Sequence, residues 1–243
     1  MTDNQRRECQ LVITDKKLPL TSSNVQIRII QLSDHDEVLN FLRTHYYKEE
    51  PLTIGSEPKE QDPEDEKFNM SQIAHGTCLL AVQQIAGDNG DSDIRERVVG
   101  VLISGPKDQH EAEHLFEEAA RFGPTKWGIA LKFLARAEEN SNVYARYSVT
   151  KALHIHILAV DRNLRGRSIG VRLVDELKRL GRQLDYPLLT LDCTSYYSAK
   201  LCERLGMDCV NVEKYQNYLD NEGKPIFRPP PPHECLKTFA MRL

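Results

Sequence analysis

The chain has 243 residues, of which 40% are hydrophobic and 28% are charged, and its formal net charge is −4. This composition is typical of a globular protein and excludes a wholly disordered chain, a collagen-like repeat and a coiled-coil rod. The longest apolar run, Cys78–Val82, is too short to span a bilayer. The acidic balance disfavours a nucleic-acid partner, because proteins that bind phosphate backbones are usually basic.

The start of the chain is polar and has no apolar segment of the kind found in secretory signals. We expect residues 1–24 to form a flexible N-terminal segment and residues 25–243 to form one domain. The six cysteines include no CxxC pair and no zinc-ribbon spacing. We therefore expect reduced thiols in the cytoplasm and no metal. We also expect a monomer without a membrane partner.

The first elements are a strand and a helix. Residues 25–30 alternate partly with period two, which is typical of a strand. Ser33 or Asp34 is a suitable N-cap for the helix that follows. Pro51 disfavours helical geometry at Glu50, so the helix is predicted to end near that residue.

An acidic segment follows. Residues 57–66 contain six acids, one lysine and two prolines. Such a charge run predicts a solvated loop or a mobile lid and not part of the core.

The middle of the chain reads as a hairpin followed by helices. Strands are predicted at 78–85 and 98–104, with a turn at 87–91. The pattern over 108–140 is helical and is broken at Gly123. The later elements are strand 153–160, helix 169–184, strand 188–191, helix 198–205, and strands 209–218 and 233–241 around a turn at 220–223. This order predicts a single mixed α/β domain.

The turn after strand 153–160 is a candidate anion site. A strand, a turn with small residues and a helix start gather free backbone N–H groups at a helix N-terminus. Four arginines lie within eleven residues: Arg162, Arg165, Arg167 and Arg172. The segment is not a P-loop, since it lacks GK[ST], and its glycine spacing does not match a dinucleotide fingerprint.

This turn resembles motif A of the GNAT superfamily of N-acetyltransferases, Q/R-x-x-G-x-G/A. Arg165 stands at the first position, Gly170 at the last, and Ser168 replaces the central glycine. A serine in this place keeps the backbone N–H for phosphate, and its hydroxyl is a possible cap for the helix.

Four further blocks are similar, in order, to insect arylalkylamine N-acetyltransferase-like enzymes. They are FLRTHYYKEEPL at 41–52, VYARY at 143–147, CTSYYSAK with ERLG at 193–206, and GK to PPH at 223–233. The resemblance implies one GNAT domain with a central, mostly antiparallel sheet flanked by helices. It also implies acetyl-CoA as co-substrate and a small primary amine, arylalkylamine or polyamine-like, as acceptor.

The resemblance places a general base at Glu50, next to Pro51 in the amine pocket, with Glu49 as the competing candidate. An alkylamine is mostly protonated at neutral pH, so a base must remove a proton before the nitrogen attacks the thioester. A bulge near Leu158 to Val160 is expected to leave a backbone N–H free for the tetrahedral intermediate. The residues implied for the cofactor are Leu158, Ala159, Val160, Arg165, Gly166, Arg167, Ser168, Ile169 and Gly170.

The family's hydroxyl pair for the departing thiolate falls on Thr194 and Ser198, with Ser198 preferred. Tyr196 and Tyr197 are alternatives, because many enzymes of the superfamily use a tyrosine there. His233 aligns with a family histidine near the amine pocket, and Tyr197 is assigned to the same pocket.

Two other interpretations remain open. His110 to His114 fits H-E-x-x-H, with Glu138 as a third zinc ligand, although the segment is an acidic amphipathic helix. A non-catalytic acetyl-CoA-binding protein is permitted by Ser168 and Thr194, and a protein or peptide N-acetyltransferase is the alternative enzyme. The acidic segment 57–66 favours a cationic acceptor, because clustered acids attract a multiply charged amine.

Overall fold

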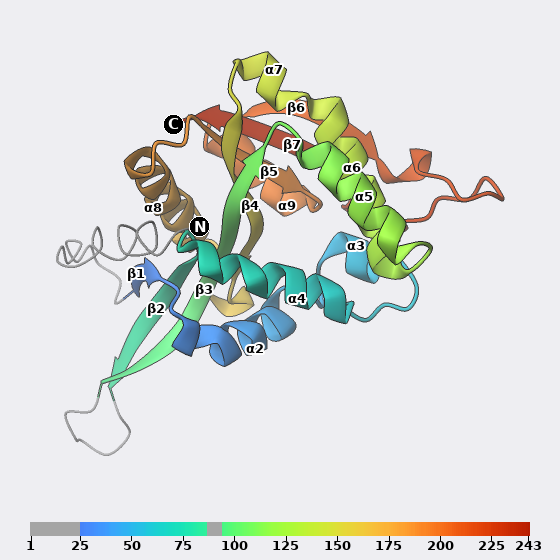
Figure 1. Ribbon diagram of the computed structural model, residues 1–243. Coiled ribbons are helices and arrows are strands. Elements are labelled where there is room, and N and C mark those ends of the chain that lie inside the picture. Colours follow the sequence, from blue (N-terminus) through green and yellow to red (C-terminus); the bar gives the residue numbers. More distant parts are fainter. Residues whose placement is uncertain (1–24, 87–93) are drawn as a thin grey trace.

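The computed structural model describes residues 25–86 and 94–243 (Figure 1). The segment predicted to be a flexible N-terminus, 1–24, and the predicted turn at 87–91 lie outside the described residues. No helix in the described part of the chain is both long and apolar enough to cross a membrane.

Within the described residues, seven strands form one sheet in the order β1-β2-β3-β4-β5-β7-β6. The strands are β1 (Val25–Ile29), β2 (Leu79–Ala86), β3 (Ile94–Asp108), β4 (Lys151–Val160), β5 (Leu188–Cys193), β6 (Asp208–Lys214) and β7 (Cys235–Arg242). All neighbours are antiparallel except β4 and β5, which are parallel. The predicted mixed α/β fold with a mostly antiparallel sheet is confirmed.

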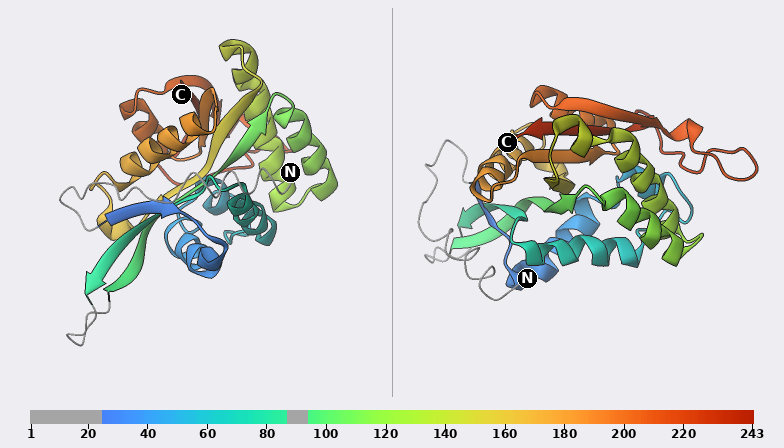
Figure 2. Two further views of the ribbon diagram at one scale, coloured as in Figure 1. Left: turned by 60° about the vertical axis from the view of Figure 1, so that its left-hand side comes forward. Right: turned by 45° about the horizontal axis from the view of Figure 1, so that its top comes forward.

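Helices cover both faces of the sheet. They are α2 (His35–His45), α3 (Pro51–Ile54), α4 (Pro63–Ser71), α5 (Glu111–Phe122), α6 (Lys126–Ser141), α7 (Val143–Tyr147), α8 (Ile169–Gln183) and α9 (Tyr196–Arg204), with short 3-10 turns between some of them. Figure 2 shows α2 and α4 on one side of the sheet and α8 and α9 on the other.

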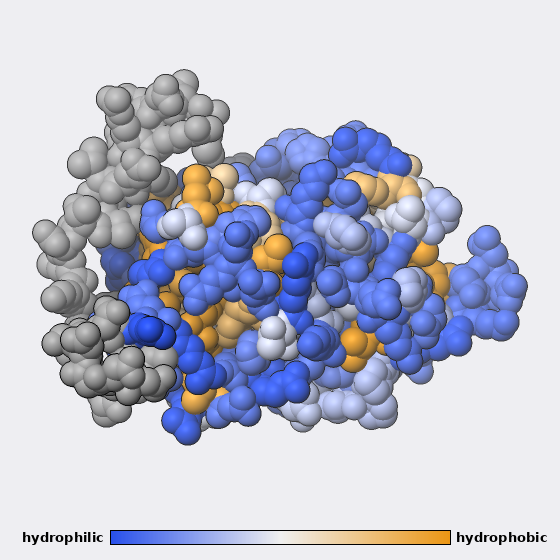
Figure 3. Space-filling view, turned by 90° about the horizontal axis from the view of Figure 1, so that it is seen from below, coloured by the Kyte–Doolittle hydropathy of each residue, from blue (hydrophilic) through white to orange (hydrophobic). Residues whose placement is uncertain are grey.

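The core is divided in the same way. Leu173 and Leu177 of α8 are fully buried against Leu153 of β4, whereas Val38 and Leu42 of α2 pack on the opposite face. Each helix meets the sheet with residues three or four apart, which is the stripe expected of an amphipathic helix. Seen from below, the surface is mostly hydrophilic, with apolar residues in small groups (Figure 3).

Two sequence expectations near the N-terminus were wrong in detail. The first helix ends at His45 instead of continuing to Glu50, and Pro51 begins the new helix α3. Proline is favoured in the first turn of a helix, because its missing N–H has no intrahelical partner there. The acidic segment 57–66 is only partly a loop, since its second half is the start of α4 and Glu66 is buried.

Candidate active site

A cleft runs into the molecule where the sheet splits. Strands β4 and β5 pair only from Leu153 with Leu189 to Ile155 with Leu191, and then they separate. The cleft that opens beyond this point has a cavity volume of about 1360 Å³. It is lined by every candidate residue named above for catalysis, substrate or cofactor except Arg167.

The wall on the β4 side ends in the candidate anion turn. Gly166 and Ser168 both adopt left-handed conformations, with φ of 79° and 61°. This backbone brings the chain from β4 to the N-terminus of α8, whose first N–H groups have no intrahelical acceptor. Ser168 is the N-cap residue but its hydroxyl makes no capping hydrogen bond, so the suggested capping role is wrong. A positive φ is costly for serine and free for glycine, which explains why motif A carries a glycine there.

The arginines of this turn differ in their partners and in whether they line the cleft. Arg165 lines the cleft, and its Nη2 lies 2.6 Å from Oε2 of Glu49. Arg162 pairs with the other oxygen of Glu49 at 3.0 Å. Arg167, by contrast, does not line the cleft. Of the two arginines implied for the cofactor, Arg165 lines the cleft and Arg167 does not.

The strand edge beside the turn is open. Leu158, Ala159 and Val160 pair with β3 on one side only, because β5 has already diverged on the other. An unpaired strand edge of this kind can hydrogen-bond an extended ligand. The register irregularity between β3 and β4 lies at His156, opposite Ile103 and Ser104, so the bulge predicted at 158–160 is misplaced. A bulge gives one strand an extra residue, and His156 is that residue.

Glu50 is a buried carboxylate at the start of α3. It is 6% exposed, and its oxygens accept hydrogen bonds from the N–H groups of Leu52 (3.0 Å) and Thr53 (2.6 Å). Pro51 follows at the first helical position and fixes the geometry of this cap. The competing acid, Glu49, is engaged in the two arginine ion pairs instead. Of the two neighbouring acids, Glu50 is the one enclosed in the cleft wall.

Hydroxyl groups gather at the N-terminus of α9. Ser195 is the N-cap, and its Oγ accepts from the N–H of Ser198 at 3.0 Å. The Oγ of Ser198 lies 2.9 Å from that of Ser195 and 3.0 Å from the Ser195 carbonyl oxygen. The carbonyl oxygen of Thr194 accepts from Tyr215 Oη at 2.6 Å. These contacts fix Ser198 and Thr194 at the cleft wall.

The C-terminal histidine meets the same helix. Nδ1 of His233 accepts from the N–H of Tyr196 at 3.2 Å, and its ring lies edge-on to Tyr197 at 5.8 Å. Partial burial lowers the pKa of His233 below its usual value, although the negative charges of Glu50 and Glu49 act to raise it. Tyr196 and Tyr197 are themselves largely exposed. A segment far along the chain thus contributes to the cleft lining, within reach of the charge of Glu50.

A charged network that was not expected from the sequence lies along the cleft. Lys107 Nζ lies 3.0 Å from Glu138 Oε2 and 3.7 Å from Glu111 Oε1. His154 contacts Thr190 Oγ1 at 2.9 Å and lies 3.8 Å from Asp192. Burial, with the charge of Lys107 adding to it, places the pKa of His154 well below its usual value. Alternate residues of a strand share a face, so the sequence His154-Ile155-His156 was a usable signal.

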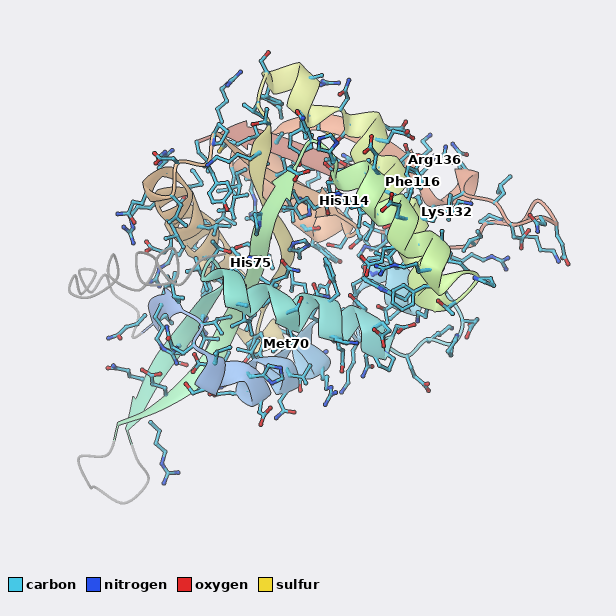
Figure 4. The ribbon with its side chains drawn as sticks, viewed as in Figure 1. Met70, His75, His114, Phe116, Lys132 and Arg136 are labelled. Carbon is cyan, nitrogen blue, oxygen red and sulfur yellow. The ribbon has the colours of Figure 1, made fainter. Side chains whose placement is uncertain are left out.

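The zinc interpretation does not match this arrangement. His110 lies at the exposed start of α5, and His114 lies on the same helix (Figure 4). Among the described residues, the acids and histidines close enough together to hold a metal ion are Glu138, His154 and Asp192, without either of these histidines. Glu138 is already paired with the ammonium group of Lys107.

Comparisons with known proteins agree on the kind of protein. The family model described as the Acetyltransferase (GNAT) family matches residues 39–207. The apo structure of an agmatine N-acetyltransferase mutant is 39% identical to this chain. The match covers 91% of this chain and 100% of the mutant's chain, with a TM-score of 0.83. The polyamine N-acetyltransferase of Drosophila melanogaster, titled as forming N-acetylagmatine, is 40% identical over 90% of this chain and all of its own (TM-score 0.81). A mosquito arylalkylamine N-acetyltransferase-like 5b is 34% identical over the same shares, at a TM-score of 0.80.

Proposed function

Since the chain belongs to the Acetyltransferase (GNAT) family, we propose that it transfers the acetyl group of acetyl-CoA to a small primary amine. One observation carries this proposal. The cleft that contains the anion turn at the start of α8 also contains the buried carboxylate of Glu50. Donor and acceptor therefore have complementary sites within one cavity, as a direct transfer between them requires.

The donor site follows from the turn and the open strand edge. The pyrophosphate of acetyl-CoA binds at the N-terminus of α8, where backbone N–H groups and the helix dipole favour an anion. Arg165 adds a positive charge once it leaves Glu49. The pantetheine arm runs along Leu158 to Val160 and supplies the hydrogen-bonding groups that β5 does not. Gly170 lies in the first turn of α8, and a Cβ there would meet Leu201, Leu158 and Val160 at ordinary contact distances.

The acceptor amine loses its proton to Glu50, directly or through water. A small ammonium group has a pKa far above neutral, so a positioned carboxylate is needed to expose the nitrogen lone pair. Glu50 keeps free lone pairs for this task beyond the two backbone hydrogen bonds that fix its orientation. The nitrogen then attacks the thioester carbonyl and forms the C–N bond of a tetrahedral intermediate, which collapses as the C–S bond breaks.

The departing thiolate of CoA leaves toward the start of α9. Ser198 is our preferred proton donor, because its hydroxyl is held by Ser195 at the cleft wall. Thr194 lies beside it, and Tyr196 and Tyr197 offer exposed phenols at the same helix terminus. His233 and Pro51 also line the cleft, and we assign them to the acceptor path.

We assign the acceptor to the small amines in preference to a protein lysine. The similar enzymes described above are named for agmatine, polyamines and arylalkylamines. Aromatic and aliphatic side chains of α6 line the acceptor end of the cleft, which suits a compact carbon skeleton.

A panel of acceptors tests this function. Release of CoA is measured with tyramine, serotonin, agmatine, spermidine and a lysine peptide, against a reaction without acceptor. We expect kcat/KM to be highest for one of the small amines. A higher value for the peptide would favour a protein acetyltransferase, and tight acetyl-CoA binding without turnover of any acceptor would favour the non-catalytic alternative.

A further inference from the structure

Asp65 is an acid in the cleft wall that the reaction described above does not use. It lies in the first turn of α4, and it lines the cleft together with Glu50 and Asp62. After burial, the charges of Glu50 and Asp65 are the largest causes that raise the pKa of Tyr46. Both side chains line the same cleft, and the charge of Glu50 also raises the pKa of Asp65.

The carboxyl group of Asp65 has an incomplete set of partners. Its Oδ1 accepts one hydrogen bond, from Asn69 Nδ2 at 2.6 Å. In the described part of the chain, no cationic side chain forms an ion pair with it. The next acid in sequence, Glu66, is by contrast held by two hydrogen bonds from Arg43, at 2.6 and 2.8 Å.

A lysine lines the same cleft but is used elsewhere. Lys126 Nζ donates to the backbone oxygens of Thr53 (3.0 Å), Pro58 (2.5 Å) and Glu60 (2.6 Å). The charges of Glu50, Asp62 and Asp65 act on this ammonium group, but all three of these hydrogen bonds go to backbone oxygens and none to a carboxylate. Burial, followed by the charge of Glu50, raises the pKa of Asp65 to about 8. A carboxyl group that is disfavoured as an anion gains most from a cation brought by a ligand.

We propose that Asp65 binds a second cationic group of the acceptor, so that the preferred substrates are diamines or amino-guanidines. This inference rests on the proposed function, in which Glu50 receives the proton of the reacting amine. The free oxygen of Asp65 accepts a charge-assisted hydrogen bond from the distal ammonium or guanidinium group. When the distal group is bound there, the reacting amine at the other end of the substrate is directed toward Glu50.

Apolar side chains that line the same cleft suit a short hydrocarbon chain. Phe68 and Trp127 line the cleft with ring centroids 5.7 Å apart, and Leu131 lies beside them. Methylene groups bury their surface against such residues while the charged ends reach the carboxyl groups. A monoamine makes the same apolar contacts but leaves Asp65 without its cation.

The test compares a dication with a monocation of similar length. Agmatine and pentylamine are assayed with the wild type, Asp65→Asn and Glu64→Gln. An asparagine keeps an oxygen for the hydrogen bond from Asn69, so the fold is retained. Glu64→Gln removes the same charge from the same helix turn at a position that does not line the cleft. We expect Asp65→Asn to lose about 10- to 100-fold in kcat/KM for agmatine, the range for a hydrogen bond to a charged group. Pentylamine and the KM of acetyl-CoA should stay unchanged, and Glu64→Gln should resemble the wild type.

Direct binding of agmatine to the CoA complex, measured by calorimetry, gives a second readout that is independent of turnover. We expect Asp65→Asn to lose this binding. Equal losses for agmatine and pentylamine would overturn the inference, as would unchanged agmatine kinetics or a wild type that binds no agmatine. If tyramine is acetylated in that case, the proposed function stands and only the second cation site fails.

Discussion

Gly170 is the residue on which the donor site depends most directly. A Cβ at this position meets only ordinary contacts, the nearest being Leu201 Cδ2 at 3.5 Å, so alanine fits without rearrangement. A glutamate would instead place bulk and negative charge at the start of α8. We predict that Gly170→Glu weakens acetyl-CoA binding at least ~100-fold, since several charge-assisted hydrogen bonds are lost. Gly170→Ala, the matched control, should bind within a few fold of the wild type by calorimetric titration. Unchanged affinity in a folded Gly170→Glu variant would place the pyrophosphate elsewhere.

Asp65 also predicts how stability depends on pH. Its pKa is about 8 in the folded chain, through burial and the charges of Glu50, Asp62 and Glu66, and about 3.9 in an unfolded chain. Between these values the folded protein holds a proton that the unfolded chain has released. The contribution of Asp65 to stability therefore falls as pH rises from about 4 to about 8, and is constant above.

Thermal melts of the wild type and Asp65→Asn across this range isolate that contribution, because the nearby Lys126 and the other groups are common to both proteins. The Tm of Asp65→Asn, relative to that of the wild type, should increase as the pH rises, and the variant should be the more stable protein at pH 8. A difference in Tm that does not change with pH would show that Asp65 titrates normally.

At the residue scale, the sequence identified which residues lie at the cleft better than it identified the contacts that they make. Glu50, Ser198 and His233 were found through the resemblance, and the structure brings all three to one cleft. Arg167, two residues from Arg165, does not line the cleft, and its role in binding the cofactor stays a prediction. Asp65 was not singled out, because composition marks the acidic segment as a whole but not which acid a fold will enclose.

Among the elements, the acidic segment 57–66 departs most from expectation. Its charge suggested a solvated loop, yet Pro63 and the cap at Asp62 begin α4, with the Asp62 carboxylate accepting from Glu64 N–H at 2.9 Å. Local N-cap and proline signals were present and were outweighed by the charge count. The bulge on β4 was misplaced for another reason, since register is set by β3, which is distant in sequence.

The side chain of Lys126 connects residues 53–60 to the start of α6. Its ammonium group bridges the backbone oxygens of Thr53, Pro58 and Glu60, which joins the wall of the acceptor site to the helix start. We predict that Lys126→Met raises the KM of the amine about 10-fold, because charge-assisted hydrogen bonds are lost, and leaves acetyl-CoA affinity unchanged. Hydrogen exchange in residues 53–61 should accelerate.

Lys132→Met is the control for this change, because Lys132 is an exposed lysine on the same helix (Figure 4). It should match the wild type in both assays. Slow exchange in residues 53–61 of Lys126→Met would mean that other contacts hold the segment.

For the whole molecule, the sequence predicted most of the architecture. Hydrophobic periodicity marks the paired strands and α8, since these elements bury one face each, and tertiary packing and local pattern agree there. Short elements such as α3 and α7 were missed, because four or five residues carry too little periodicity. The split between β4 and β5, which creates the cleft, depends on where pairing stops, and no local pattern encodes that point.

The central claim is that this N-acetyltransferase uses Glu50 to deprotonate the acceptor. We predict that Glu50→Gln lowers kcat by ~10²–10⁴, the usual range for a general base. The amide group of glutamine opposes one of the two N–H donors of α3, so we also expect a stability loss of about 1 kcal/mol. Glu49→Gln is the matched control, because Glu49 is the adjacent acid but is paired with Arg162 and Arg165.

The decisive measurement is kcat for the best small amine with the wild type, Glu50→Gln and Glu49→Gln at neutral pH, with acetyl-CoA affinity measured alongside. Our account predicts a large loss of kcat for Glu50→Gln alone, with acetyl-CoA affinity retained in that variant. A folded Glu50→Gln protein with near-normal kcat, or a comparable loss in Glu49→Gln, would contradict it.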